Sequence, residues 1–124
     1  MPILGVGVDL VRAPRFALAM ERNGERLLKR LFTESERTYC LSKKDPVPHL
    51  AARFGVKEAF IKAMGSRRGI RMAEIEVTRH TSGRITLTLH GQAEIKAREK
   101  GIRSIYISIA HDGEYGIGEV ILEG

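Results

Sequence analysis

The sequence of 124 residues is short of cysteine, tryptophan and long apolar runs, and each shortage excludes classes of protein. The single cysteine, Cys40, rules out a disulfide within the chain and fits a reducing compartment. No apolar run approaches the roughly 20 residues that span a bilayer. The apolar start of the chain also lacks the charged segment that precedes the core of a signal peptide. We therefore expect a cytoplasmic protein with one domain over residues 1–124 and no membrane partner.

Common motifs of nucleotide and metal chemistry are missing as well. There is no Walker loop, the spacing of cysteine and histidine offers no zinc site, and Gly5-Val6-Gly7 is only a fragment of a dinucleotide-binding fingerprint. What the chain has in excess is positive charge, with a net charge of +6. A basic surface favours nucleic acid, an anionic membrane, a phosphorylated cofactor or an acidic protein, and composition does not choose among them.

The order of the hydrophobic patterns predicts an α+β domain, because helical periodicity comes first and period-two strands follow. Thr33 and Glu36 match a capping box that opens one helix, and Pro46 and Pro48 are expected to end that segment. The expected helices are 14–22, 25–32, one opening at 33, 49–64 and 92–100. The expected strands are 3–11, a hairpin around 75–77 and 85–89, 105–109 and 115–122.

Asp9 is unusual because it interrupts an apolar strand, Gly7-Val8-Asp9-Leu10-Val11. A buried carboxylate is unfavourable unless it is paired or binds a cation. Asp9 is therefore either a salt-bridged or capping residue at a strand end or a ligand for a positive ion, and its spacing alone leaves both readings open.

The expected helix from His49 to Met64 is apolar nearly all round, which predicts that it is buried. Yet it carries four charged residues, Arg53, Lys57, Glu58 and Lys62. These charges must be paired or must line a cleft. The simplest alternative is an i,i+4 ion pair between Glu58 and Lys62.

Two further side chains, His111 and Cys40, have groups that can take part in catalysis. His111 follows a strand and precedes the Asp112-Gly113 turn, where a histidine is either a structural hydrogen-bonding residue or a catalytic one. Cys40 follows apolar helical positions, so a packed thiol is favoured over a nucleophile.

The segments that hold these residues occur in the same order as the characteristic segments of one known protein family, and the chain has the length of that family's members. They are Gly5 to Val11 with Arg15-Phe16, Leu31-Phe32-Thr33 with Glu36 and Tyr39-Cys40, 52–65 with Lys57, Glu58 and Lys62, 74–77, and 107–111 with Tyr115. Together they resemble the holo-[acyl-carrier-protein] synthases, the small group of the 4′-phosphopantetheinyl transferase superfamily. The chain departs at Met72, where members often have an aromatic residue, and at Ala110, where they have a serine. Ser108 is then the more plausible hydroxyl.

The resemblance implies a fold and a reaction. The fold would be that of the 4′-phosphopantetheinyl transferases, an antiparallel sheet packed against a long central helix. The reaction would move the phosphopantetheine arm of coenzyme A to a serine of an acyl carrier protein and release adenosine 3′,5′-bisphosphate, in support of fatty acid biosynthesis. A divalent metal, Mg²⁺ or Mn²⁺ in its place, would align the diphosphate.

The resemblance also implies roles for single residues. Asp9 and Glu58 would hold the metal and act in catalysis together with Lys62, which would steady phosphate charge. Coenzyme A would be bound by Lys44, Arg53, Lys62, Gly65 and His111, and the carrier protein by Arg15, Arg22 and Arg26. The enzyme would be a homotrimer with its sites between subunits. The base that activates the carrier serine stays open between a metal-bound water and a carboxylate.

Two other classes of function compete with this reading. A nucleic-acid-binding domain is suggested by the net charge and by Arg67-Arg68 with Arg71, but stacking surfaces are scarce at 6% aromatic residues without tryptophan, so we expect no nucleic-acid partner. An interaction domain that has lost activity would be expected to lose Asp9, Glu58 or Lys62, and all three are present.

Overall fold

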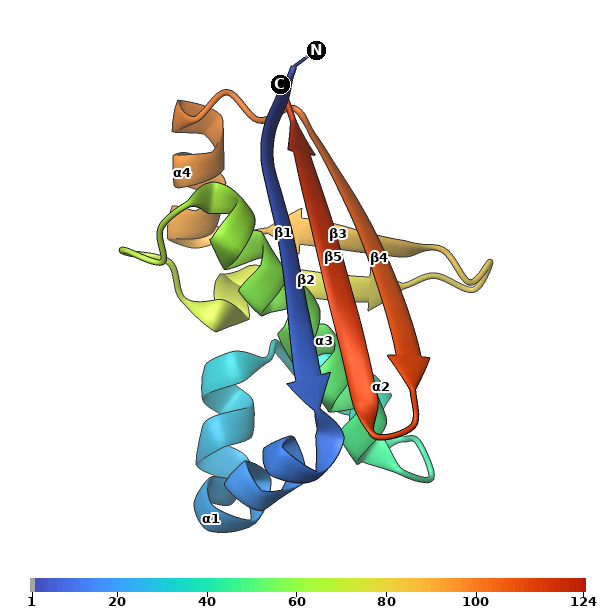
Figure 1. Cartoon of the computed structure of the whole chain (residues 1–124). Coiled ribbons are helices and arrows are strands. Elements are labelled where there is room, and N and C mark those ends of the chain that lie inside the picture. Colours follow the sequence, from blue (N-terminus) through green and yellow to red (C-terminus); the bar gives the residue numbers. More distant parts are fainter. Residues whose placement is uncertain (1) are drawn as a thin grey trace.

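The computed structural model describes residues 2–124 and has the predicted α+β fold, with one helix lying against an antiparallel sheet (Figure 1). The three-stranded sheet has the order β1-β5-β4, and a separate hairpin joins β2 and β3. The strands are β1 (Ile3–Arg12), β2 (Ile75–Arg79), β3 (Ile85–Leu89), β4 (Ser104–Asp112) and β5 (Tyr115–Glu123). The first and last strands are neighbours and antiparallel, so the two chain ends meet at one end of the sheet (Figure 1).

The helices begin and end largely where their capping signals predicted. They are α1 (Ala13–Leu31), α2 (Glu34–Leu41), α3 (Pro46–Met64) and α4 (Gly91–Glu99), with a 3₁₀ turn, η1 (Met72–Glu74). Gly24, at φ 52°, kinks α1 where the sequence predicted an interruption, and Thr33 and Glu36 form the predicted capping box of α2.

The prediction for the two prolines was wrong. Helix α2 has already ended at Leu41, and α3 begins at Pro46 rather than at His49. Pro46 and Pro48 therefore lie in the first turn of α3, where backbone N–H groups have no acceptor within the helix and proline removes nothing.

Helix α3 approaches the sheet by backbone contact, because glycines on β1 and β5 leave no side chain between them. A Cβ added to Gly7 would lie 1.9 Å from the carbonyl oxygen of Ala59, and one added to Gly118 would lie 2.6 Å from the amide nitrogen of Val56. The backbone of α3 therefore lies directly against the first strand. This close packing also buries α3 on nearly every side, as its composition predicted.

One ion pair lies inside the core, between Lys57 of α3 and Glu36 of α2, and both side chains are fully buried. Lys57 Nζ donates to Glu36 Oε1 at 2.6 Å, to the Leu31 carbonyl at 2.8 Å and to the Met72 carbonyl at 3.0 Å. Glu36 also accepts hydrogen bonds from the backbone of Thr33 at 2.9 Å and Val77 at 2.8 Å. Burial lowers the pKa of Lys57, and the charge of Glu36 opposes that shift.

Cys40 is also fully buried, and burial raises the pKa of its thiol, which agrees with the predicted packed thiol. Across residues 2–124, none of the helices is both long and apolar enough to cross a membrane.

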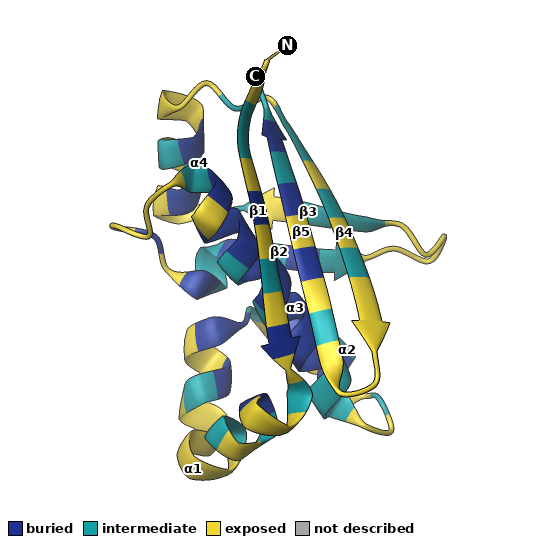
Figure 2. Ribbon diagram, viewed as in Figure 1, coloured by how far each residue is buried: buried dark blue, intermediate teal, exposed yellow. Residues whose placement is uncertain are grey.

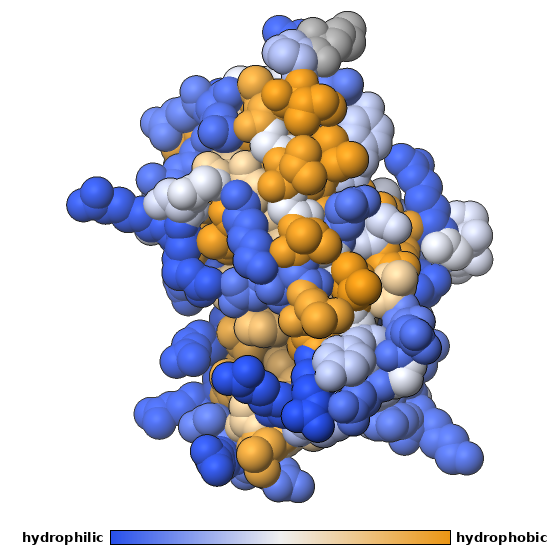
Figure 3. All heavy atoms as spheres, viewed as in Figure 1, coloured by the Kyte–Doolittle hydropathy of each residue, from blue (hydrophilic) through white to orange (hydrophobic). Residues whose placement is uncertain are grey.

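The outer face of the three-stranded sheet, on the side away from α3, is apolar and yet exposed. Its residues along β1 are Val6, Val8 and Leu10, each more than half exposed. Figure 2 shows exposed positions alternating with more buried ones along this strand. Ile117 of β5 and Tyr106 of β4 extend this face. Figure 3 shows it as a band of hydrophobic side chains over β1 and β5. An apolar patch of this extent is typical of an interaction surface.

We expect the backbone contact between β5 and α3 to be essential for stability. Gly118→Ala would place a methyl group against the Gly55–Val56 peptide, so the strand or the helix must shift, and we expect a loss of about 1–3 kcal/mol in the free energy of unfolding. Gly116→Ala, on the same strand, meets only the Ala52 Cα at 3.9 Å and is the matched control. Urea unfolding of both variants measures the difference, and equal stability of the two would contradict the proposed contact.

Candidate active site

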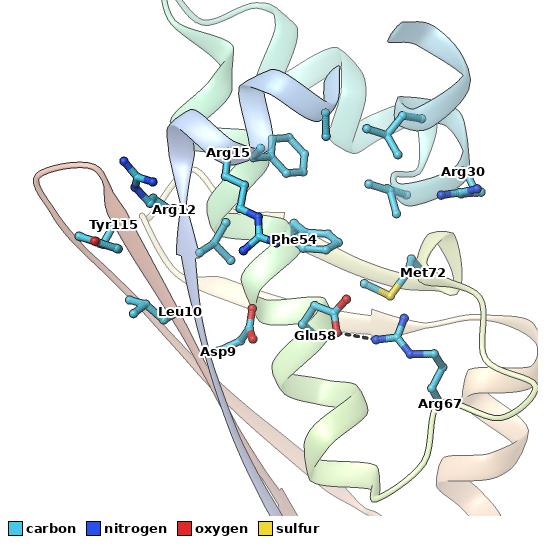
Figure 4. Close-up of a pocket in the computed structure, with 15 residues that line it drawn as sticks. Asp9, Leu10, Arg12, Arg15, Arg30, Phe54, Glu58, Arg67, Met72 and Tyr115 are labelled. Atoms are coloured by element: carbon cyan, nitrogen blue, oxygen red, sulfur yellow. Dashed lines mark hydrogen bonds and ion pairs between the residues drawn. The ribbon is translucent and has the colours of Figure 1, made fainter. Parts of the chain in front are cut away.

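A pocket of about 660 Å³ opens between β1, α1 and α3. Its apolar lining includes Phe16, Leu27, Leu31, Phe54 and Met72. Its polar lining includes two acids, Asp9 and Glu58, four arginines, Arg12, Arg15, Arg30 and Arg67, and Tyr115. Figure 4 shows the two acids next to one another, with the Arg15 guanidinium reaching toward them from α1. The pocket is therefore a basic opening with a pair of carboxylates inside it.

Asp9 reaches the pocket because of the alternation along β1. Side chains two residues apart share a face of a strand, so Asp9 lies on the same face as Gly7, which contacts α3. Lys62 Nζ donates to Asp9 Oδ1 at 2.9 Å and to the Val8 carbonyl at 3.0 Å. The Asp9 side chain is 17% exposed, whereas that of Lys62 is 54% exposed. Of the two readings of Asp9, the salt bridge is present, and the carboxylate also faces a pocket.

Glu58 reaches the same pocket from α3, directly after the buried Lys57. Arg67, in the connection that follows α3, donates from Nη2 to Glu58 Oε2 at 2.7 Å (Figure 4). The alternative of an i,i+4 ion pair between Glu58 and Lys62 was therefore wrong. Each acid of the pocket has its own cation, because Lys62 extends to β1 while Arg67 folds back along the helix.

The two carboxylates have the chemistry of a magnesium site. Asp9 Oδ2 and Glu58 Oε1 form no hydrogen bond within residues 2–124, so each acid has one oxygen free toward the pocket. Mg²⁺ typically takes one or two carboxylates and completes its shell with water and phosphate oxygens. The described chain holds no group of three or more histidine, cysteine or acidic residues that could bind a metal. The donor set thus fits a hard cation that shares its ligands with a substrate.

A second cationic cluster lies where α2 ends and α3 begins. The ring of Tyr39 lies 4.4 Å from Lys43 Nζ and 4.6 Å from Arg53 Cζ. Arg53 is 5% exposed, and its Nε is buried without a hydrogen-bond partner in the described chain. Burial lowers the pKa of the neighbouring His49, and Arg53 and Lys43 lower it further. Cations gathered in this way indicate that an anion can bind there.

The remaining residues predicted to bind coenzyme A or the carrier protein lie apart from one another in the single chain. Gly65 caps α3 in the left-handed conformation, at φ 85°, and Lys44 is exposed between α2 and α3. His111 is exposed on β4, which β5 separates from β1, and it does not line the pocket. Arg22 and Arg26 are exposed on α1.

Sequence reasoning missed two contacts of this site. The sequence predicted that Lys57 must be paired or line a cleft, but it did not identify Glu36 as its buried partner. Arg67 was noticed only as part of a basic segment. Its place two residues after the glycine that caps α3 was the available signal, because a chain that reverses there can return to the last turns of the helix.

Comparison with known proteins agrees with this geometry. The family model of the 4′-phosphopantetheinyl transferase superfamily (ACPS) matches residues 5–115. The chain is 46% identical over 127 residues to a holo-[acyl-carrier-protein] synthase of Syntrophotalea carbinolica, covering 100% of this chain and 99% of that one. It is also 42% identical to the synthase of Koribacter versatilis, covering 98% of each.

Solved structures give the same result. The synthase (AcpS) of Neisseria meningitidis superposes with a TM-score of 0.92 at 26% identity, covering 99% of this chain and 100% of that one. An ACPS–CoA complex from Chronobacterium ammoniagenes superposes with a TM-score of 0.84 at 34% identity, covering 98% and 97%. With a family model that spans most of its length and relatives above 40% identity, the chain belongs to the holo-[acyl-carrier-protein] synthase family of the 4′-phosphopantetheinyl transferase superfamily.

Proposed function

We propose that the pocket between β1 and α3 carries out the family's transfer, moving phosphopantetheine from coenzyme A to a serine of an apo acyl carrier protein. The serine oxygen attacks the phosphorus that bears the phosphopantetheine, and the bond to the leaving adenosine 3′,5′-bisphosphate breaks. The observation that carries the proposal is the pair of acids, Asp9 and Glu58, each with a free oxygen toward one basic pocket. Phosphoryl transfer depends mainly on alignment and charge neutralisation, which such a pocket provides.

Asp9 and Glu58 would hold a divalent ion, with Mg²⁺ as the natural choice and Mn²⁺ able to replace it. The ion, when bound, supplies positive charge to the diphosphate oxygens. Lys62 lies against Asp9 with a half-exposed side chain, so it can place a further positive charge where phosphate charge builds up as the bond breaks. We assign no protein residue as the base that activates the serine.

Coenzyme A carries a third phosphate, on its ribose, and the cationic cluster at Arg53 would bind it. The unpartnered Nε of Arg53 and the positive charge of Lys43 nearby support an anionic ligand. Arg53 precedes Glu58 by five residues, which is about 7.5 Å along a helix axis and within reach of one nucleotide. Lys44 and Gly65, at the two ends of α3, and His111 remain candidates for further contacts.

His111 would act from a neighbouring subunit, because it lies away from the pocket of its own chain. The apolar outer face of the sheet supports association with other copies, since Val6, Val8 and Leu10 on β1 leave it exposed in one chain. The occupant we propose is the same face of this protein, and the number three follows from the family resemblance. Glu119 and Ser108, also exposed in the middle of the three strands, would be the polar residues of this interface.

The carrier protein would dock on α1. Arg15, Arg22 and Arg26 are exposed on this helix, and Arg15 also lines the pocket. A basic helix next to the reaction site suits an acidic partner, since complementary charge speeds encounter and orients the serine toward the diphosphate.

The metal assignment can be tested with two isosteric changes. We expect Asp9→Asn and Glu58→Gln each to lower kcat/KM by about 100-fold or more, because each removes a carboxylate ligand while keeping its shape. Transfer is followed by weighing the carrier protein in a mass spectrometer, and thermal melting checks the fold. Glu99→Gln, an exposed acid on α4, is the control. Near-normal transfer by either site variant at limiting Mg²⁺ would contradict the shared metal site.

Assembly can be tested on β1. Val6→Arg should convert the trimer to monomer, because three charged side chains would be buried in the proposed interface. Light scattering behind size exclusion measures the mass. Ile95→Arg changes a comparably exposed isoleucine on α4 and should leave the trimer intact. A wild-type protein that stays monomeric, or a trimeric Val6→Arg variant, would contradict this interface.

Carrier docking can be tested on α1. Arg15→Glu should raise the KM for carrier protein by about tenfold and change the KM for coenzyme A little. Arg22→Glu, outside the pocket, should act in the same direction, and both effects should shrink with added salt as the Debye length falls from about 10 Å at 0.1 M to about 3 Å at 1 M. The control is Lys100→Glu, an exposed lysine after α4. Equal changes in both KM values would show that the carrier docks elsewhere.

A further inference from the structure

Arg67 lines the pocket and donates to an acid that the proposed chemistry assigns to the metal. Its guanidinium lies 2.7 Å from Glu58 Oε2 and so occupies one oxygen of a proposed metal ligand. Gly65 and Gly69, both with positive φ, allow the connection after α3 to turn back on the helix and bring Arg67 there. The backbone conformation of this connection therefore allows Arg67 to lie beside Glu58.

This ion pair has the properties of one that can open. The Arg67 side chain is 60% exposed and that of Glu58 is 18% exposed, so the arginine lies at the solvent side of the pair. Exposed pairs of this kind contribute little net stability, whereas the fully buried pair of Lys57 and Glu36 belongs to the core. Within residues 2–124, Arg67 forms no ion pair other than the one with Glu58.

We propose that Arg67 is an exchangeable counter-ion of Glu58. In the metal-free enzyme it neutralises and orients the carboxylate. When a divalent ion takes that carboxylate, Arg67 leaves it and binds the diphosphate of coenzyme A. This inference rests on the metal site proposed above.

The binding of Arg67 to the diphosphate follows from the loss of its partner, Glu58. Once Glu58 ligates a metal, the guanidinium is left at the pocket without an acid. A guanidinium matches two phosphate oxygens at once, which the ammonium of Lys62 does not. A metal held by Asp9 and Glu58 would align the diphosphate of coenzyme A, so the diphosphate oxygens would be the acceptors available to Arg67.

The exchange predicts opposite effects on two ligands, which a purely structural residue would not produce. Arg67→Gln removes the competitor, so Mn²⁺ alone should bind about two- to fivefold more tightly than to wild type. The same variant should bind coenzyme A about tenfold more weakly in the presence of Mn²⁺ and about equally in its absence. Arg68→Gln removes a neighbouring exposed arginine and should leave all three affinities within twofold of wild type.

Electron paramagnetic resonance of free Mn²⁺ and calorimetry with coenzyme A measure these affinities on the full-length enzyme. Arg67→Lys keeps the charge but not the paired donors, so it should restore the Mn²⁺ affinity of wild type and only part of the coenzyme A affinity. Unchanged or weaker Mn²⁺ binding by Arg67→Gln would overturn the exchange, as would equal loss of coenzyme A affinity with and without metal.

The same titration distinguishes a failure of this inference from a failure of the proposed metal site on which it rests. If Glu58→Gln loses Mn²⁺ binding while Arg67→Gln behaves as wild type, the exchange is wrong and the metal site stands. If wild type binds no Mn²⁺, or Glu58→Gln binds it normally, the metal site is wrong and the exchange is wrong with it.

Discussion

The buried ion pair between Lys57 and Glu36 is the interaction on which the rest of the structure depends. The three ammonium hydrogens of Lys57 point to oxygens at the end of α1, in α2 and in η1, and Glu36 accepts a further bond from Val77 in the middle of β2. Five segments are thus joined at one buried point. A charge in such a place is tolerated only because every donor is satisfied, and removing either partner would leave the other charge buried and alone.

This pair also determines how α3 presents Glu58 to the pocket. Consecutive residues on an α-helix point about 100° apart, so a Lys57 held toward the interior fixes where Glu58 can point. Glycines on β1 and β5 set the distance between α3 and the sheet, because they let the backbone of α3 approach both strands closely. Rotation of the helix and its distance from the sheet are therefore fixed by separate contacts. Asp9 and Glu58 meet in the pocket as a result of both.

The sequence was informative wherever the signal was local. Strands, turns, the capping box at Thr33 and the kink at Gly24 follow from short patterns and agree with the structure. The anomaly at Asp9 and on the charged helix also drew attention to the residues that now line or border the pocket.

What the sequence could not supply was the pairing between distant segments. Lys57 and Glu36 are joined across 21 residues and Lys62 and Asp9 across 53, and no periodicity relates such positions. The prolines in the first turn of α3 misled for another reason, since proline both ends helices and begins them. Resemblance to a family named Asp9, Glu58 and Lys62 as candidates, but it did not indicate that Lys62 pairs with Asp9 or that Arg67 pairs with Glu58.

The glycine contacts between β1 and α3 bear on the choice of metal. Where side chains separate two elements, rotamer changes can widen a site, but here backbone touches backbone, so only the Asp9 and Glu58 side chains themselves can adjust. Ca²⁺ needs ligand distances of about 2.3–2.6 Å and six to eight oxygens, whereas Mg²⁺ accepts about 2.0–2.1 Å and fewer protein ligands. Two carboxylates held on a frame that cannot expand would therefore discriminate by ionic radius, favouring the smaller ion without any additional ligand.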